Sequence, residues 1–368
     1  MIAHARESGT STPAGRPRSQ RGLHVFACVL VALTVGLIAA GAMVTSTGSG
    51  LSVPDWPTTY GENMFTFHPS KWVGGIFYEH GHRLFAASVG FLTIILAVMA
   101  QVSARTKTIR VLGWTALAAV IAQGVLGGMT VKFMLPTWIS VFHACLAQTF
   151  LCILVTIAVL THSRWNAPRT TPSTSVTERR PSALRIAPLA LVVVVFAQLI
   201  AGALMRHTQS GLAVPDFPLA YGQVVPDLTA DAVMAYNDTR AFDYQMNPVT
   251  RLQIVFHLIH RAGAILVVIA VVAAAASMRK KNGVVPAARQ SIAWIIFFVT
   301  IQVTLGAFTI WSEKLPAVAT AHVAVGAATL AMAWRCFLIT RLSPAERAMP
   351  ARASAAADDS MAIAGALA

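Results

Sequence analysis

The sequence predicts an all-α membrane protein with eight transmembrane helices arranged as two pseudo-symmetric four-helix bundles. Hydrophobic residues make up 56% of the 368 residues, charged residues only 11%, and the mean hydropathy is +0.64. A soluble protein of this size needs about a quarter of its residues charged to cover its surface. Two further observations specify the architecture: the chain contains eight long apolar segments, and its second half repeats its first.

Each apolar segment is about 20 residues long. A helix of this length spans the hydrocarbon core of a bilayer. Polar or basic stretches separate the segments. In order they occupy residues 24–45, 80–102, 111–131, 138–161, 186–206, 253–277, 291–311 and 317–340.

The basic residues indicate the orientation of the helices. The net charge is +14, but most of the 28 Lys and Arg residues lie in alternate connections between the apolar segments. Such a bias marks cytoplasmic loops in membrane proteins. We therefore expect a multi-pass protein of the cell (inner) membrane with both termini in the cytoplasm, and no nucleic-acid partner.

The internal repeat divides the chain into two halves. GAMVTSTGSGLSVPDWPTTYG at 41–61 returns as GALMRHTQSGLAVPDFPLAYG at 202–222, and the second half carries extra residues around 223–250. The first segment resembles a signal peptide, but its mid-chain counterpart predicts that it is retained. We expect a disordered cytoplasmic N-terminus (1–22), an N-terminal half (23–161), a cytoplasmic linker (162–185), a C-terminal half (186–340) and a cytoplasmic tail (341–368).

Four histidines occupy matched places in the repeat, just inside the outer ends of the second and fourth segments of each half. They are His82, His143, His260 and His322. Ionisable side chains are costly within hydrocarbon, so a matched set predicts a function. Two imidazoles on facing helices of a bundle can bind haem from both sides, whereas zinc or copper sites more often add Cys or carboxylate ligands. The alternative for each histidine is a packing or hydrogen-bonding role.

The segment EHGHR, from Glu79 to Arg83, contains two candidate ligands. His80 and His82 lie about 200° apart on a helix, so only one can face the bundle centre. The repeat selects His82, because only this histidine precedes an arginine in both halves. The sequence gives His80 no role.

Glu79 lies one helical turn before His82, and the second half has His257 at this position. The carboxyl group is either a reactive group beside a haem or the i,i+4 ion-pair partner of Arg83, and the two roles are compatible. Arg83 and Arg261 are candidates to bind haem propionates, with a role as interfacial arginines as the alternative.

Other repeated features have structural explanations. The segments TGSGLSVPDWP and TQSGLAVPDFP predict tight outer turns, which are also candidate lids over the haem edges. Gln123 and Gln302 predict close helix packing. All four cysteines lie in apolar segments, so we expect no outer-loop disulfide; they are Cys28, Cys145, Cys152 and Cys336.

Taken together, these motifs resemble the haem A synthases, from about residue 24 to 340. The resemblance implies oxidation of the C8 methyl group of haem O to a formyl group by successive hydroxylations, giving haem A for cytochrome c oxidase. It further implies that His260 and His322 bind a haem b cofactor, that haem O lies near His82 and His143, and that Glu79 acts in catalysis. A haem O synthase is then the expected upstream partner. Some members have an outer-loop cysteine pair that this chain lacks.

Two other classes of protein fit parts of the pattern. A transmembrane electron-transfer cytochrome also has two haem sites, but it usually places ligands near both faces of the membrane, whereas all four histidines here lie toward the outer face. A duplicated transporter often has inverted repeats and broken helices, whereas four helices per half keep these repeats parallel.

Overall fold

The computed structural model describes residues 18–162, 182–279 and 286–342, and within them the predicted eight-helix membrane fold is confirmed. No β-strand forms in these ranges, only two isolated bridges. Backbone groups in a bilayer have no water to bind, so a spanning segment must satisfy them internally as a helix. The spanning helices are α1 (Arg18–Ser46), α2 (Gly75–Ser103), α3 (Lys107–Lys132), α4 (Thr137–Thr161), α5 (Ser182–His207), α7 (Arg251–Arg279), α8 (Pro286–Trp311) and α9 (Pro316–Leu342).

Most helices are longer than the apolar segments, because polar residues extend them beyond the hydrocarbon. Helix α1 begins at Arg18 and α5 at Ser182, so the ends of the predicted stretches 1–22 and 162–185 are helical. Thr106 caps α3 by accepting a hydrogen bond from the Ile109 N–H, and prolines open α8 and α9. The remainder of the predicted N-terminus, linker and tail lies outside the described residues.

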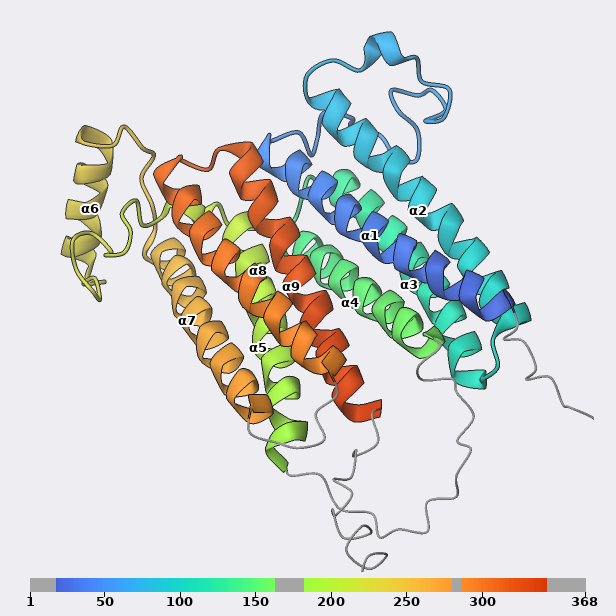
Figure 1. Cartoon of the computed structure of the whole chain (residues 1–368). Helices are drawn as coiled ribbons and strands as arrows, with labels where there is room; N and C mark the ends of the chain where they lie inside the picture. Colours follow the sequence, from blue (N-terminus) through green and yellow to red (C-terminus); the bar gives the residue numbers. More distant parts are fainter. Residues whose placement is uncertain (1–17, 163–181, 280–285, 343–368) are drawn as a thin grey trace, which may run out of the picture.

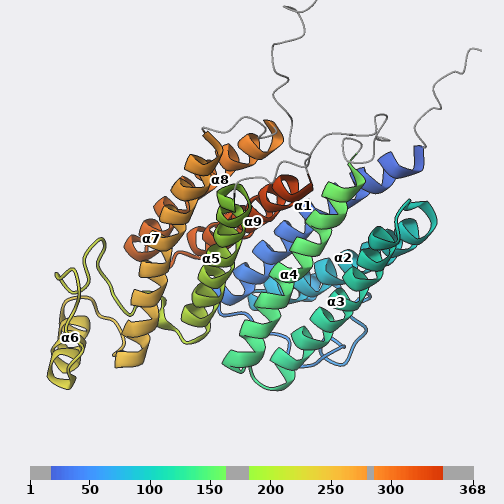
Figure 2. The same ribbon diagram turned by 90° about the horizontal axis from the view of Figure 1, so that it is seen from below.

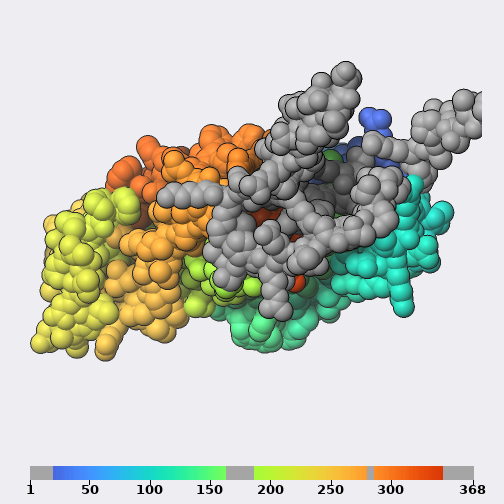
Figure 3. Space-filling view, turned by 60° about the horizontal axis from the view of Figure 1, so that its bottom comes forward, coloured from blue at the N-terminus to red at the C-terminus, as the bar shows by residue number. Residues whose placement is uncertain are grey.

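Helix contacts follow the division into halves (Figures 1 and 2). Helices α1 to α4 contact one another in sequence and α4 closes against α1, while α5, α7, α8 and α9 make the equivalent set of contacts. Contacts of α1 and α4 with α5 and α9 join the halves, which lie side by side (Figure 3). The pseudo-symmetric relation between the halves stays a prediction.

Polar groups reinforce the apolar packing between the halves. Arg206 at the end of α5 donates hydrogen bonds to the Ala42 carbonyl and, at 2.6 Å, to the Ser46 hydroxyl of α1. Deeper in the membrane, the Trp334 indole of α9 donates to the Thr156 hydroxyl of α4 at 2.8 Å. The two halves are therefore attached at two depths.

The outer turn after α1 is folded around Asp55. Its carboxylate accepts hydrogen bonds from the backbone N–H groups of Tyr60 and Gly61 and from the Thr58 hydroxyl. Burial tends to raise the pKa of Asp55, but these hydrogen bonds outweigh it and lower the pKa to about 2. Asp216 binds Tyr221 and Gly222 in the same way in the second half. The predicted tight turns are thus present.

The extra residues of the second half form a short helix that the sequence did not predict, α6 (Ala230–Phe242). Arg240, only 4% exposed, donates to the Leu212 and Asn247 carbonyls, and Asn237 exchanges hydrogen bonds with the Val249 backbone. Figures 1 and 2 show α6 at the far end of the molecule, beyond α7. Apolar packing adds to these polar contacts, because Tyr236 of α6 stacks on Tyr221 and Val233 packs on the same buried cluster.

All four cysteines are free, as expected: Cys28 is exposed, Cys145 and Cys152 are half-buried and Cys336 is buried. We predict that replacing all four with Ala leaves the fold and bound pigment intact. Loss of the buried Cys336 sulfur should cost only about 1 kcal/mol, as for removal of one core methylene. Pigment content and thermal unfolding of the purified variant are the measurements. Loss of turnover with both preserved would show that a thiol takes part in the chemistry.

Candidate functional site

In the second half, the structure brings His260 of α7 and His322 of α9 together. Their ring centroids are 6.3 Å apart with the ring planes at 68°. This separation leaves room for one metal atom with a bond of about 2.0 Å to a nitrogen of each ring. Glycines make the space: a Cβ atom on Gly202 would lie 3.0 Å from the His260 ring, and one on Gly306 would lie 3.3 Å from the His322 ring.

Two glutamines contact these imidazoles. Gln198 of α5 donates to the His260 carbonyl at 2.8 Å, and its amide nitrogen lies 3.1 Å from His260 Nδ1. The amide nitrogen of Gln302 lies 3.3 Å from His322 Nε2. From the sequence, Gln302 was predicted to serve helix packing, and Gln198 was not identified. A single amide side chain within the apolar segment of α5 could have indicated a hydrogen bond between helices.

The first half repeats the contacts between histidine and glycine. His82 of α2 lies against Gly41, where a Cβ atom would be 3.0 Å from its ring, and His143 of α4 lies against Gly127 at 3.2 Å. Gln123 donates to the His143 carbonyl at 2.9 Å. Each predicted histidine therefore lies against a helix glycine, and among the described residues the rings of His260 and His322 are in direct contact.

The donor groups fit haem. The Nδ1 atoms of His82, His143 and His322 are buried without a hydrogen-bond partner among the described residues. A buried polar atom without a partner costs about 1–3 kcal/mol, so a set of them indicates a ligand. No cluster of three or more metal-ligating side chains occurs in the described part of the chain, and pairs of imidazoles are the ligand set of haem in helix bundles.

Glu79 is 4% exposed and forms the predicted ion pair with Arg83, at 2.6 Å. Its second carboxylate oxygen accepts a hydrogen bond from the Val53 N–H at 2.8 Å. Arg83 also donates to the carbonyls of Val53, Asp55 and Thr58. The pair therefore fastens the outer loop to α2, one turn from His82.

In the second half, no helix carboxylate among the described residues takes part in attaching the loop around Asp216 to α7. His257, 3% exposed, lies with Nδ1 3.0 Å from the Ser210 carbonyl, and Arg261 donates to the carbonyls of Asp216 and Leu219. The Arg261 guanidinium also stacks over the Phe217 ring. Glu79 thus remains the only carboxyl group in the described spanning helices.

His80 faces away from the His82 site, which confirms that only one of the two histidines points inward. It is fully buried, its Nδ1 is 3.1 Å from the Thr59 hydroxyl, and its ring packs edge-on against Trp72 and beside Phe67. His80 is a core residue of the first outer loop.

The second half also carries two cations that the sequence analysis missed. Arg206 and Lys314 occupy the repeat positions of Thr45 and Leu135. Lys314 and Leu135 both have a left-handed backbone conformation. The Lys314 side chain lies against Gly211, and the Leu135 side chain lies against Gly50. Neither cation has a carboxylate partner among the described residues.

The two cations lie near each other, and Arg206 lies near the second histidine pair. Burial, followed by repulsion from Arg206 and Arg240, lowers the pKa of Lys314. Arg206 is near enough to His322 to act on it electrostatically. The outer end of the second half is therefore positive, whereas the first half has a carboxylate beside its histidines.

Comparison with known proteins agrees with this architecture. Residues 24–334 match the COX15-CtaA family model, described as cytochrome oxidase assembly protein. The heme A synthase of Halalkalibacterium halodurans is 29% identical over 214 residues, 57% of this chain and 67% of the relative. That of Alkalihalophilus pseudofirmus is 27% identical over 51% of this chain and 61% of its own. That of Symbiobacterium thermophilum is 31% identical over 51% and 60%.

The aligned regions thus span about three fifths to two thirds of these relatives. The family model, in contrast, covers all eight spanning helices almost completely, together with both histidine pairs. The chain belongs to the COX15-CtaA family of cytochrome oxidase assembly proteins.

Proposed function

We propose that this protein is a haem A synthase, which oxidises the C8 methyl group of haem O to a formyl group and so supplies haem A for cytochrome c oxidase. The relatives named heme A synthase support the activity. The observation that carries the proposal is the chemical difference between two matched histidine pairs. Only the first pair has a carboxylate within one helical turn.

In this proposal the second half holds haem b. His260 and His322 would hold its iron, and Gln198 and Gln302, which contact the two imidazoles, would fix the orientation of these rings. Arg206 and Lys314, with Arg261 as the sequence suggested, balance the charge of its propionates. When bound, haem b supplies reversible one-electron transfer.

The first half receives haem O near His82 and His143. Glu79 accepts a proton released from the methyl group, because it is the only spanning-helix carboxylate and it lies beside His82. Arg83 and the Val53 N–H orient the carboxylate and keep the loop over the site. Trp56 of this loop packs directly on Gly128 of α3, next to the glycine that faces His143, and so limits the entry of water.

Membrane orientation and partners belong to the same proposal. The protein lies in the cell membrane with both termini in the cytoplasm and both haem sites toward the outer face. All four histidines lie in the first third of α2, α4, α7 or α9, the helices that run inward from that face. Haem O reaches the first half from a haem O synthase.

Pigment extraction from the purified wild-type protein tests the function. Haem b together with haem O or haem A, identified by mass analysis, is the expected result. Two haem b groups per chain would instead indicate an electron-transfer cytochrome and would reject the synthase.

The assignment of the cofactor half predicts a spectral effect. Changing His260 or His322 to Ala should remove an axial ligand, so that haem b is lost or becomes high-spin and turnover falls at least about a hundredfold. The matched changes at His82 or His143 should leave the low-spin haem b spectrum largely intact while impairing haem O conversion. A normal low-spin spectrum in either second-half variant would contradict the ligand assignment.

The role of Glu79 predicts a change in product. Glu79→Gln keeps the shape and the acceptor for the Val53 N–H but removes the base, so haem O or a hydroxylated intermediate should accumulate while haem b is retained. Turnover should fall by about 10²–10⁴. Chromatography of the extracted pigments is the measurement.

The matched control is Glu62→Gln, because Glu62 forms an exposed ion pair with Lys71 in the same outer loop. This control should make haem A normally. Near-normal haem A from Glu79→Gln would leave Glu79 only its structural role with Arg83.

A further inference from the structure

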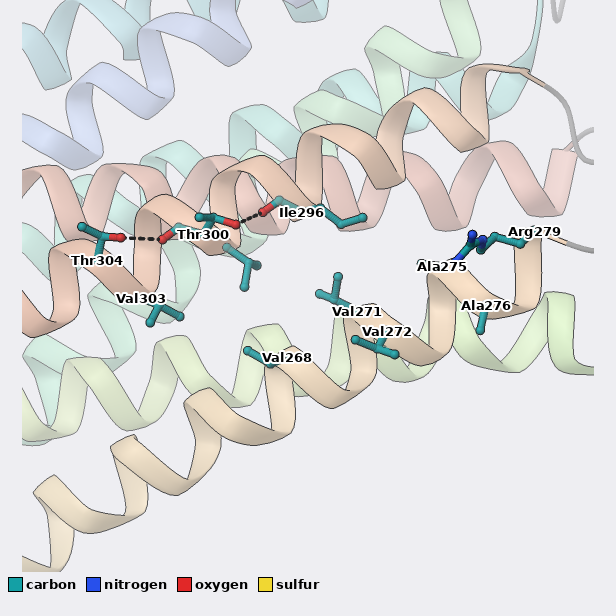
Figure 4. Close-up of a pocket in the computed structure, with 11 residues that line it drawn as sticks. Val268, Val271, Val272, Ala275, Ala276, Arg279, Ile296, Thr300, Val303 and Thr304 are labelled. Atoms are coloured by element: carbon teal, nitrogen blue, oxygen red, sulfur yellow. Dashed lines mark hydrogen bonds between the residues drawn. The ribbon is translucent and has the colours of Figure 1, made fainter. Parts of the chain in front are cut away.

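A groove opens between α7 and α8, and its lining runs from Arg279 at the end of α7 to Thr304 of α8 (Figure 4). Its volume is about 560 Å³. Most of its lining is aliphatic, and one charged side chain, Arg279, lies at its end. The lining residues are Val268, Val271, Val272, Ala275, Ala276, Arg279, Ile296, Val299, Thr300, Val303 and Thr304.

The two threonines do not make the groove polar. The Thr300 hydroxyl donates to the Ile296 carbonyl and the Thr304 hydroxyl to the Thr300 carbonyl, both at 3.0 Å, as the dashed lines in Figure 4 show. Hydroxyl groups satisfied within their own helix need no further partner. The walls therefore suit a hydrocarbon chain.

The equivalent helices of the first half, α2 and α3, pack together more extensively than α7 and α8, and the repeat shows why. Gly113 lets α3 approach α2 closely, since a Cβ atom there would lie 2.9 Å from Ala100 Cβ. The equivalents of Gly113 and Ala100 are the bulky, buried Ile292 and Met278. These larger side chains hold α7 and α8 apart.

The helices α7 and α8 also lack a polar contact that joins α2 to α3. In the first half the Trp114 indole of α3 donates to Gln101 of α2 at 3.2 Å. The second half has Ala293 and Arg279 at these positions, so this bridge does not form. The groove is thus a consequence of residues that differ between the halves.

Along α7, the groove has the length of one membrane leaflet, and its α8 wall continues to Thr304. From Val268 to Arg279, α7 rises roughly 16 Å, about half of a hydrocarbon core of ~30 Å. The outer His260 precedes Val268 by about two turns. Arg279 is the last residue of α7, at the side that the distribution of basic residues assigns to the cytoplasm.

The charge at this end is positive and unbalanced. Arg279 and Arg289 are both exposed, and neither forms an ion pair with a described residue. Arg289 precedes Ile296 by seven residues and therefore lies on the groove-facing side of α8. The sequence from Arg279 to Arg289 contains no Asp or Glu.

We propose that this groove binds an anionic phospholipid of the cytoplasmic leaflet. One acyl chain lies along the aliphatic walls, and the phosphate pairs with Arg279 and Arg289. Guanidinium groups bind phosphate oxygens in a bidentate manner, and basic pockets between helices on the cytoplasmic side select anionic headgroups.

The test is native mass spectrometry of the full chain, delipidated in detergent and titrated with phosphatidylglycerol or with phosphatidylcholine of the same acyl chains. The wild-type protein should bind phosphatidylglycerol roughly tenfold more tightly. The double change Arg279→Gln and Arg289→Gln should abolish this preference. Arg105→Gln, at an exposed cytoplasmic-side arginine of the first half, should preserve it.

A second variant tests the contribution of the groove independently of the two arginines. Ala276→Phe fills the groove at an exposed position and should reduce binding of both lipids, whereas Val98→Phe, at the matching place on α2, should not. Circular dichroism confirms the fold of each variant. Equal affinity for the two lipids, unchanged binding in the arginine variant or an equal loss in Arg105→Gln would overturn the proposal. The proposal would also be overturned if a second copy of the chain occupied the groove and excluded lipid, or if an uncharged isoprenoid chain displaced the phospholipid.

Discussion

The structure depends on placing imidazole groups inside a membrane, where a polar atom without a partner is costly. Each of the four histidines has a helix glycine against its ring, so the space beside the imidazole exists only because a side chain is missing. Three of them leave a buried Nδ1 atom without a protein partner. A ligand that binds imidazoles from two sides relieves this cost, and the planar macrocycle of haem fits between helices that are held apart in this way.

The two halves have similar loops after their first helices but different charges. In both halves an aspartate orders the turn and the arginine after the histidine binds the loop carbonyls. Glu79 makes the first site able to accept a proton, whereas Arg206 and Lys314 make the second site suited to an anionic group. In the proposed function, this difference assigns the chemistry to the first site and the retained cofactor to the second.

Much of this arrangement follows from the sequence. Segment lengths gave the eight helices, and the repeat paired the histidines and chose His82 over His80. Contacts between distant segments were not predictable: Gln198 contacts His260, and Lys314 contacts Gly211, only because the folded chain brings these segments together. Helix α6 lacked a strong apolar periodicity and was missed, because hydrogen bonds of Arg240 and Asn237 hold it in place together with the stacking of Tyr236 on Tyr221.

Direct conversion of haem O by the purified protein tests the central claim that the first half is the site of methyl oxidation. The protein, embedded in lipid vesicles with an electron acceptor, is supplied with haem O, and the pigments are followed by chromatography and mass spectrometry. The account predicts a product that has gained one oxygen and lost two hydrogens, with an alcohol formed before it, and no product when His82 and His143 are both changed to Ala. Haem O recovered unchanged from a protein that retains haem b, or full conversion by the double variant, would contradict it.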